Sequence, residues 1–195
     1  MYIHHPLLNS ILIDHSTIQR WVFKFSKEIE QNMNTRKRRV MDSWRLDETY
    51  IKVSGKDRYL YRAVDKQGNT VDFLLTKRRI KGSAQKFLNK AIGNNGKPRI
   101  INIDKSGANT AGIKTWNKRN LTSNKIKIRR VKYLNNIVEQ DHRSIKRRIA
   151  ITTGFKEFES AQSTLAGIEI INIIRKGQIL NPRTSTFKTF CSLAA

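Results

Sequence analysis

Three acidic residues, Asp47, Asp104 and Glu139, have the types and the spacing of a site for phosphate chemistry. Asp104 follows Asp47 by 57 positions, and 34 residues separate Asp104 from Glu139. A site made of three carboxylates offers hard oxygen ligands, which suit Mg²⁺ or Mn²⁺ and disfavour Zn²⁺. Two such ions about 3.5 to 4 Å apart can activate an attacking oxygen on one side of a phosphate and stabilise the leaving oxygen on the other.

The residues that follow Glu139 allow two interpretations. Arg143 and Lys146 stand at i+4 and i+7, so the acid and both bases share one face of a predicted helix. They could form a surface salt-bridge ladder, in which each pair contributes roughly 0.2 to 0.5 kcal/mol. Alternatively, Glu139 holds a metal ion while Lys146 binds a DNA phosphate nearby. The spacing alone leaves both interpretations open.

The charge balance indicates a polyanionic partner. Lys and Arg total 39 against 15 Asp and Glu, which gives a net charge of +24, so nucleic acid is the expected partner. The apolar share of 38% is sufficient for a folded core. No stretch approaches the roughly 18 apolar residues of a membrane span, and we expect a cytoplasmic, DNA-associated protein. Cys191 is the single cysteine, which excludes an intramolecular disulfide and a cysteine-based zinc cluster.

The elements that must position the acids begin with three predicted strands. Residues 44–55, which contain Asp47, are rich in β-branched and aromatic types, as are residues 58–65 and 70–76. Tight turns that contain glycine join them, which predicts an antiparallel meander. Residues 83–92 then place apolar side chains at the spacing of a helix.

Asp104 ends a fourth predicted strand, residues 99–104, whose two faces are both apolar, as is typical of parallel strands. We predict the remaining elements as a helix over 106–118, a strand over 125–133, a helix over 135–149 and a last helix over 160–175. The first strand and the first parallel strand of a mixed sheet are neighbours, so Asp47 and Asp104 can converge there. A helix packed across that edge could present Glu139. The predicted fold is α/β, a ribonuclease-H-like mixed sheet with flanking helices.

A short helical segment precedes this sheet. Residues 14–25 place apolar side chains at i, i+3, i+4 and i+7, which predicts an amphipathic helix: Ile18, Trp21, Val22 and Phe25. Arg20 and Lys24 lie on its outward face. This pattern fits a recognition helix in a DNA groove, but a plain docking helix would show the same pattern.

Three separate motifs together resemble the DDE transposases of bacterial insertion sequences, in particular the insertion-sequence-six family. They are "WRLDETYIKVSGKDRYLYRAVDKQGNTVDFLLT", "INIDKSGANT" and "KYLNNIVEQDHRSIKRR", in the order and with the 34-residue second gap of that family. The resemblance implies that Asp47, Asp104 and Glu139 are the catalytic, metal-binding triad of a ribonuclease-H-like domain. It also implies that Lys146, seven residues after the glutamate, contacts the transposon end.

The resemblance implies a reaction and partners as well. Water cuts one strand at each transposon end, and the freed 3′ hydroxyl attacks a phosphate of target DNA, usually giving a cointegrate. Two Mg²⁺ ions are the implied cofactors, with Mn²⁺ as a substitute. Double-stranded DNA, both transposon end and target, is the implied partner, and a homodimer is expected because two ends must be held together.

The expected domain organisation has three parts. Residues 1–40 are interpreted as the remnant of a helix-turn-helix, residues 41–180 as the catalytic domain, and residues 181–195 as a tail. A helix-turn-helix needs two helices around a short turn, and the residues before Asp14 include "HHPLL", a poor helix. We therefore expect an N-terminally truncated copy in which recognition of terminal repeats is impaired.

Two rival functions remain. A relic could act as a basic DNA-binding protein whose acids merely pair with lysines, and a resolving nuclease of the same fold would cleave branched DNA without joining it. Among the other polar residues, Glu48 should point to the opposite face from Asp47, and His142 is interpreted as a surface residue. The acids interpreted as local turn residues are Asp57, Asp65 and Asp72.

Overall fold

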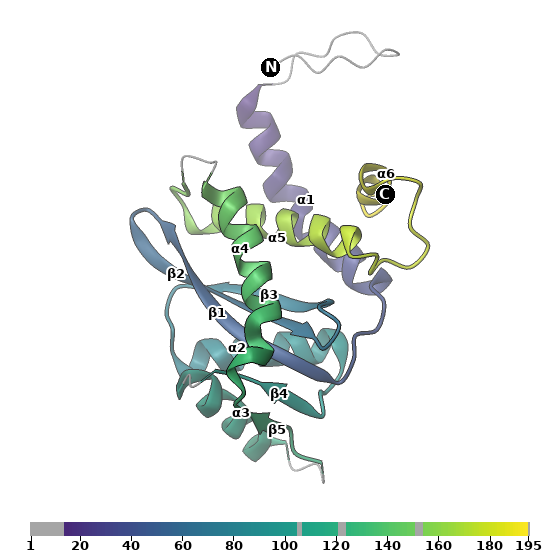
Figure 1. The fold of residues 1–195 in the computed structure, drawn as a ribbon. Helices are drawn as coiled ribbons and strands as arrows, with labels where there is room; N and C mark the ends of the chain where they lie inside the picture. Colours follow the sequence, from purple (N-terminus) through teal and green to yellow (C-terminus); the bar gives the residue numbers. More distant parts are fainter. Residues whose placement is uncertain (1–13, 105–106, 121–123, 151–153, 195) are drawn as a thin grey trace.

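A five-stranded mixed sheet forms the centre of the protein in the computed structural model, which describes residues 14–104, 107–120, 124–150 and 154–194 (Figure 1). The strand order is β3-β2-β1-β4-β5. β1 pairs antiparallel with β2 and parallel with β4. The strands span Ser43–Val53 (β1), Lys56–Asp65 (β2), Thr70–Thr76 (β3), Ile100–Asn102 (β4) and Lys127–Arg129 (β5).

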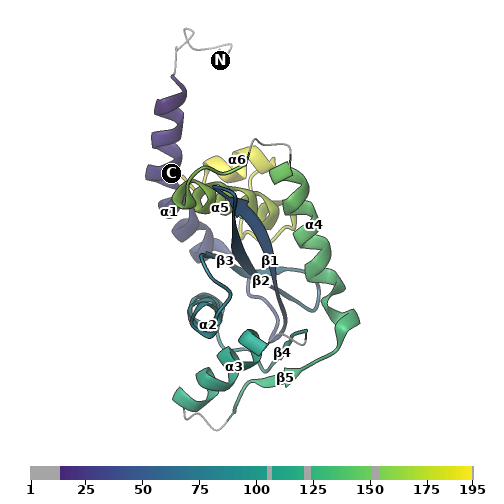
Figure 2. The same ribbon diagram turned by 90° about the vertical axis from the view of Figure 1, so that its left-hand side faces the viewer.

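Helices cover both faces of the sheet. In Figure 2 the strands lie between α2 and α3 on one side and α4 on the other, and α5 packs on the α4 side. The order of strands and helices is the one predicted from the sequence. The helices span His15–Arg36 (α1), Lys81–Asn95 (α2), Gly107–Arg119 (α3), Asn136–Ala150 (α4), Phe158–Arg175 (α5) and Thr186–Cys191 (α6), with a 3₁₀ turn, η1, at Lys132–Asn135.

A two-residue turn sets the register of the β1–β2 hairpin. Ser54 and Gly55 connect the paired residues Val53 and Lys56, and both have positive φ, 50° and 70°. Positive φ at both central positions is the signature of a type I′ turn, whose twist matches that of the flanking strands. The register that follows places Asp47 of β1 opposite Arg62 of β2.

The face that carries α2 and α3 holds the larger aromatic core. Trp44 and Leu46 of β1 pack there with Phe87 and Leu88 of α2, all of them at most 1% exposed. The helical pattern predicted for residues 83–92 is therefore confirmed. α2 and α3 approach each other so closely that a Cβ on Gly112 would lie 2.8 Å from the Cβ of Ala84.

The opposite face packs α4 and α5 against the hairpin. Ile145 of α4 meets Ile51 and Val53 of β1 and Leu165 of α5 in a second apolar cluster. Val138 and Ile145 are fully buried, as the spacing of apolar residues along this helix predicts. α4 is thereby fixed across β1 and β2, over the face that carries Asp47.

α1 is longer than predicted and only partly packed. It begins after Asp14, whose carboxylate accepts a hydrogen bond from Ser16 N (3.3 Å), and its second half packs Met33 into a cluster with α5 and α6. The first half projects from the body (Figure 1). The apolar side chains expected to be buried there remain 38% to 48% exposed: Trp21, Val22 and Phe25.

Some predicted boundaries were wrong. β5 is three residues long because the chain turns into η1 at Lys132, although the alternating pattern predicts a strand as far as residue 133. The tail after Pro182 forms α6, capped by Ser185, whose hydroxyl accepts a hydrogen bond from Lys188 N. Residues 1–13, which contain the "HHPLL" segment, lie outside the described residues. None of the described helices combines the length and the apolar character that crossing a membrane requires.

Candidate active site

The parallel pairing of β1 with β4 makes neighbours of the two strands that carry or precede Asp47 and Asp104. Arg45 of β1 is paired with Asn102 of β4. The same register continued for two residues would set Asp47 beside Asp104, with both side chains on the face that carries α4. Asp104 lies two residues after the end of β4 and is exposed, whereas the side chain of Asp47 is 17% exposed.

Two buried asparagines connect the start of α4 to β1 and β4. Asn102 Nδ2 donates hydrogen bonds to Asn135 Oδ1 (2.7 Å) and to the carbonyl of Val131 (2.9 Å). Asn135 Nδ2 reaches the carbonyl of Leu46 in β1 at 3.5 Å, and Asn135 directly precedes α4. Because Glu139 lies in the first turn of α4, these bonds hold the backbone that carries it close to Leu46 of β1 and to the end of β4. Neither asparagine was predicted from the sequence, although a polar residue inside an apolar strand was a signal.

His142 is not a surface residue, so its interpretation from the sequence was wrong. It is 5% exposed, one turn after Glu139, and its Nδ1 lies 3.4 Å from Asp47 Oδ2. Its Nε2 is buried and has no hydrogen-bond partner among the described residues. The contact joins α4 directly to Asp47 through one carboxylate oxygen. The spacing was a signal that could have found it, because His142 continues the buried stripe of Val138 and Ile145.

The side chain of Glu48 lies on the opposite face of the sheet from Asp47, as predicted. Its carboxylate is ion-paired with Arg79 and accepts a hydrogen bond from Asn109 Nδ2 of α3 (2.5 Å). Burial lowers the pKa of Arg79, but the charges of Glu48 and Asp104 outweigh this effect and raise it. Burial, with a contribution from Glu48, also raises the pKa of Tyr61 to about 12. Glu48 is therefore committed to the α2–α3 side of the sheet.

The three predicted acids have the chemistry of a divalent-metal site, but within the described ranges no group of three or more His, Cys, Asp or Glu side chains is placed to hold an ion. The convergence of Asp47, Asp104 and Glu139 on metal therefore stays a prediction. Its support is the backbone arrangement, since neighbouring strands carry the two aspartates and the first turn of α4 carries the glutamate. Carboxylate oxygens are the ligands that Mg²⁺ and Mn²⁺ prefer.

Basic residues extend along the exposed side of α4. Arg143 and Lys146 are both exposed, and the ammonium of Lys146 lies 4.5 Å from the centre of the Tyr50 ring. Tyr50 is 56% exposed, so the pair forms a cation–π contact at the surface. On α1, Arg20 and Lys24 are also exposed, and Arg20 Nη2 donates to Thr17 Oγ1 (3.1 Å). Whether these residues bind DNA stays a prediction.

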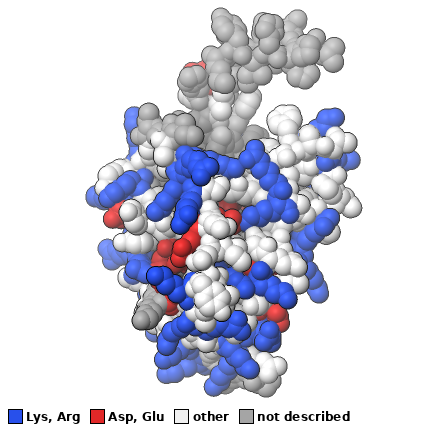
Figure 3. Space-filling model, in the orientation of Figure 1, with Lys and Arg blue, Asp and Glu red and all other residues white. Residues whose placement is uncertain are grey.

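The face of the molecule that carries α4 combines both signs of charge in a distinct pattern. Carboxylates gather near its centre, and lysine and arginine side chains surround them (Figure 3). In a chain of net charge +24, such a face attracts a polyanion to the border of an acidic centre. This is the arrangement expected where nucleic acid meets a cation-binding site.

The three acids interpreted as turn residues have different environments. Asp65 is a local turn residue, as predicted, because its Oδ1 accepts hydrogen bonds from Gln67 N (2.9 Å) and Asn69 N (3.0 Å). Asp72 also makes a local hydrogen bond, from Phe73 N to its Oδ1 (2.8 Å), but it is in addition buried within β3 and lies 3.2 Å from Lys90 Nζ. Asp57 pairs with Lys52 at 2.8 Å on the exposed hairpin.

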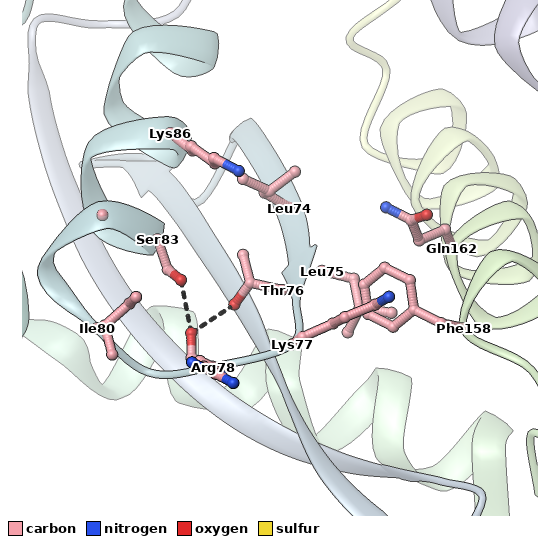
Figure 4. A pocket seen from close by; sticks show the side chains of 11 residues that line it. Leu74, Leu75, Thr76, Lys77, Arg78, Ile80, Ser83, Lys86, Phe158 and Gln162 are labelled. Atoms are coloured by element: carbon pink, nitrogen blue, oxygen red, sulfur yellow. Dashed lines mark hydrogen bonds between the residues drawn. The ribbon is translucent and has the colours of Figure 1, made fainter.

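A cavity of about 470 Å³ lies away from the predicted site, between the end of β3, the start of α2 and Phe158 of α5 (Figure 4). The hydroxyls of Ser83 and Thr76 both donate to the carbonyl of Arg78, at 2.6 and 3.1 Å. Lys77 lies over the Phe158 ring. The two hydroxyls of this cavity thus share one acceptor, and none of the predicted site residues lines it.

Solved structures of retroviral integrases share this fold. The catalytic core domain of BIV integrase superimposes with a TM-score of 0.52 at 18% identity, covering 77% of this chain and 94% of that one. An intasome of simian T-cell lymphotropic virus, solved in complex with PP2A regulatory subunit B56 gamma, gives 0.52 at 15% identity, with 80% and 56% covered. The chain therefore has the ribonuclease-H-like fold of integrase catalytic cores.

Sequence comparisons define the family. A family model described as a DDE domain matches residues 41–178. The transposases of the insertion sequence-like element IS431mec and of IS257 in transposon Tn4003, both from Staphylococcus aureus, are 37% identical over 171 residues, covering 84% of this chain and 71% of their own length. The chain belongs to the DDE transposases of bacterial insertion sequences, in the insertion-sequence-six family, and is a polynucleotidyl transferase.

Proposed function

We propose that the protein cleaves one DNA strand at each end of an insertion sequence and transfers the freed end to target DNA, with a cointegrate as the product. The observation that supports this proposal is the pairing of β1 with β4 under the start of α4, because the three acids belong to these elements or closely follow them. Membership of the DDE family gives these acids their proposed role.

Asp47, Asp104 and Glu139 would hold two divalent metal ions, Mg²⁺ or Mn²⁺. When bound, such ions supply charge stabilisation to the phosphate and lower the pKa of a bound water. The chain contributes the orientation of the carboxylates, through the β1–β4 pairing and the Asn102–Asn135 bond. His142 approaches one of the two oxygens of Asp47, Oδ2, at 3.4 Å.

The proposed reaction needs no covalent bond to the protein. In the first step the oxygen of water bonds to phosphorus, and the 3′ oxygen leaves with its electron pair and is protonated. In the second step that 3′ hydroxyl attacks a target phosphate, and a target 3′ oxygen leaves. Both are displacements at phosphate, in which positioning and charge stabilisation supply the catalysis.

The proposed partner is double-stranded DNA, both transposon end and target. Lys146 and Arg143 would contact the backbone next to the site, and Arg20 and Lys24 would contact it along α1, which lies in the proposed N-terminal helical segment, residues 1–40. The proposed catalytic domain, residues 41–180, carries the acids, and a homodimer would hold both ends. Exposure of all four side chains supports these contacts.

A basic DNA-binding protein without catalysis is the second candidate. The charge of +24 supports it equally, and the described residues hold no ready-made cluster of three metal ligands. In this alternative the protein binds DNA without needing Mg²⁺ and cuts no strand when Mg²⁺ is present.

Incubation with labelled DNA from either side of the encoding gene, a target plasmid and Mg²⁺ separates the two candidates. We expect nicking at the ends and joining to the plasmid, both reduced at least about 100-fold by Asp104→Asn. Asp57→Asn removes the same charge from an exposed hairpin pair and should act as wild type. Binding without nicking by the wild-type protein would establish the second candidate, and nicking of branched DNA without joining would indicate a resolving nuclease.

A further inference from the structure

A buried ion-pair network lies next to the predicted site. Arg62, at the middle of β2, has a side chain that is 0% exposed, and so has Glu169 of α5. Arg62 Nη2 donates to Glu169 Oε2 at 2.9 Å, and Arg62 Nε lies 2.6 Å from Glu169 Oε1. The latter contact is an ion pair whose angle falls outside hydrogen-bond geometry. This pair was not predicted from the sequence because Glu169 stands within an apolar run.

Asp141 of α4 joins this network from the other side. Its Oδ2 accepts a hydrogen bond from Arg62 Nη2 at 3.2 Å and another from Lys176 Nζ at 2.5 Å. Lys176 also donates to the carbonyl of Gly68 (2.8 Å) and to Thr70 Oγ1 (3.2 Å), in the β2–β3 connection. One oxygen of Asp141 therefore connects α4 to β2, to the residue that follows α5 and, through Lys176, to a turn of the sheet.

The network is electrically balanced, with two cations and two carboxylates. Buried charges are costly unless they are paired in good geometry, so the helix positions compatible with these contacts are few. Shifting or rotating α4 would separate Asp141 from both partners. The fully buried Arg62 would then keep only one of its two carboxylate partners.

The geometry of α4 relates this anchor to Glu139. At about 100° per residue, Val138, His142 and Ile145 form the buried stripe, and Glu139 and Asp141 flank it on opposite sides. Asp141 faces β2 and α5, which are on one side of β1 in the sheet. Glu139 is thereby turned towards the other side, where β4 lies and Asp104 follows its last residue by two positions. Two acids only two residues apart thus have different partners.

We propose that Asp141, held by Arg62 and Lys176, is a positioning residue that sets the rotation of α4 and so directs Glu139 towards Asp47 and Asp104. This inference rests on the proposed function, because it assumes that Glu139 is a metal ligand. Asp141 itself touches neither metal nor DNA.

Metal binding tests the proposal directly. Mn²⁺ is titrated into wild-type protein, and free ion is followed by electron paramagnetic resonance. We expect Asp141→Asn to weaken Mn²⁺ binding about tenfold, as the loss of an orienting partner typically does. Lys176→Gln, which is remote from the metal, should act in the same direction with a smaller effect. Asp57→Asn is the matched control and should leave binding unchanged.

Activity gives a second measurement that a loss of folding would not reproduce. Mg²⁺ demands near-ideal octahedral geometry, so a misdirected Glu139 should raise the Mg²⁺ concentration needed for half-maximal nicking. Mn²⁺ should restore a larger fraction of the activity in Asp141→Asn than it does in Glu139→Gln. A variant that was only less stable would show a lower melting temperature and equal losses with both metals.

The outcomes separate this inference from the function on which it rests. If wild-type protein binds Mn²⁺ and nicks DNA while folded Asp141→Asn and Lys176→Gln both bind the ion as tightly as wild type, the positioning role is overturned. If wild-type protein and Glu139→Gln bind Mn²⁺ equally weakly and neither nicks DNA, the proposed function fails first and the positioning role is rejected with it.

Discussion

At the scale of single residues, the contacts around α4 distinguish side chains that look alike in the sequence. Glu139, Asp141 and His142 are within four positions of one another, yet each has a different environment. Asp141 is ion-paired with buried Arg62, and His142 contacts Asp47. Arg62 and Glu169 are 107 positions apart, so no local pattern could have predicted their pairing. A residue's role here depends on partners that only the fold supplies.

Lys146 gives a prediction at this scale. Each phosphate that a protein cation neutralises on duplex DNA contributes about 0.9 to the steepness with which log K falls as log salt rises. If Lys146 binds one phosphate, Lys146→Ala should weaken DNA binding across sequences and make this slope shallower by about 1. Fluorescence anisotropy with a labelled duplex at several salt concentrations measures both. Lys188→Ala, on the distant and exposed α6, is the control, and an equal change in both variants would contradict a specific role for Lys146.

At the scale of elements, close contacts between helices and strands hold in place the segments that flank the predicted site. α3 begins three residues after Asp104, and it packs on α2 with Gly112 against Ala84. On the other face, apolar packing and the Arg62 network hold α4. The segments on both sides of the predicted site are therefore fixed by packing that involves no DNA and no metal.

Gly112→Ala tests the contact between α2 and α3. The added methyl would lie 2.8 Å from Ala84 Cβ, so the helices must separate, at a cost of about 1 to 3 kcal/mol. Urea denaturation should show this loss. Adding Ala84→Gly removes the opposing methyl, so the double variant should be more stable than the sum of the single effects predicts. Additive effects would show that the clash is absorbed elsewhere.

The segment between α1 and β1 gives a prediction about pH. Burial lowers the pKa of Lys37 from its ordinary 10.5 to about 8; the charge of Asp72 partly offsets this lowering and the charge of Lys90 adds to it. The ammonium of Lys37 donates a hydrogen bond to the carbonyl of Val71 at 2.6 Å. Between pH 8 and 10.5 the unfolded chain binds more protons at this residue than the folded chain. The free energy of unfolding should therefore rise with pH in that window, by at most about 3 kcal/mol.

The variant Lys37→Met isolates this contribution. Its stability should lack the rise, so the difference in unfolding free energy between wild type and variant should increase in favour of wild type from pH 8 to 10.5. Other groups that titrate in the same range cancel in the difference. Chemical denaturation at four pH values measures it, and a constant difference would show that Lys37 keeps its ordinary pKa.

At the scale of the whole molecule, the fold could be predicted from sequence further than the site could. The order of strands and helices along the chain could be predicted because their signals are strong, such as the apolar stripe of α2 and the turn at Ser54–Gly55. Burial of α1 was overestimated, since an apolar stripe shows which face would pack but not whether a neighbour reaches it. For the site, the motifs indicated Asp47, Asp104 and Glu139, but Asn102, Asn135 and His142 required the tertiary structure.

The projecting half of α1 has a consequence for the length of DNA that the protein could engage. Arg20 lies six residues before Ser26, whose hydroxyl already contacts Ser163 of α5, so the distance between them is about 9 Å along the helix axis. A duplex touching both this outlying arm and the catalytic face must bridge that offset. A short oligonucleotide could contact either the projecting half of α1 or the face that carries α4, whereas a longer double helix could contact both at the same time.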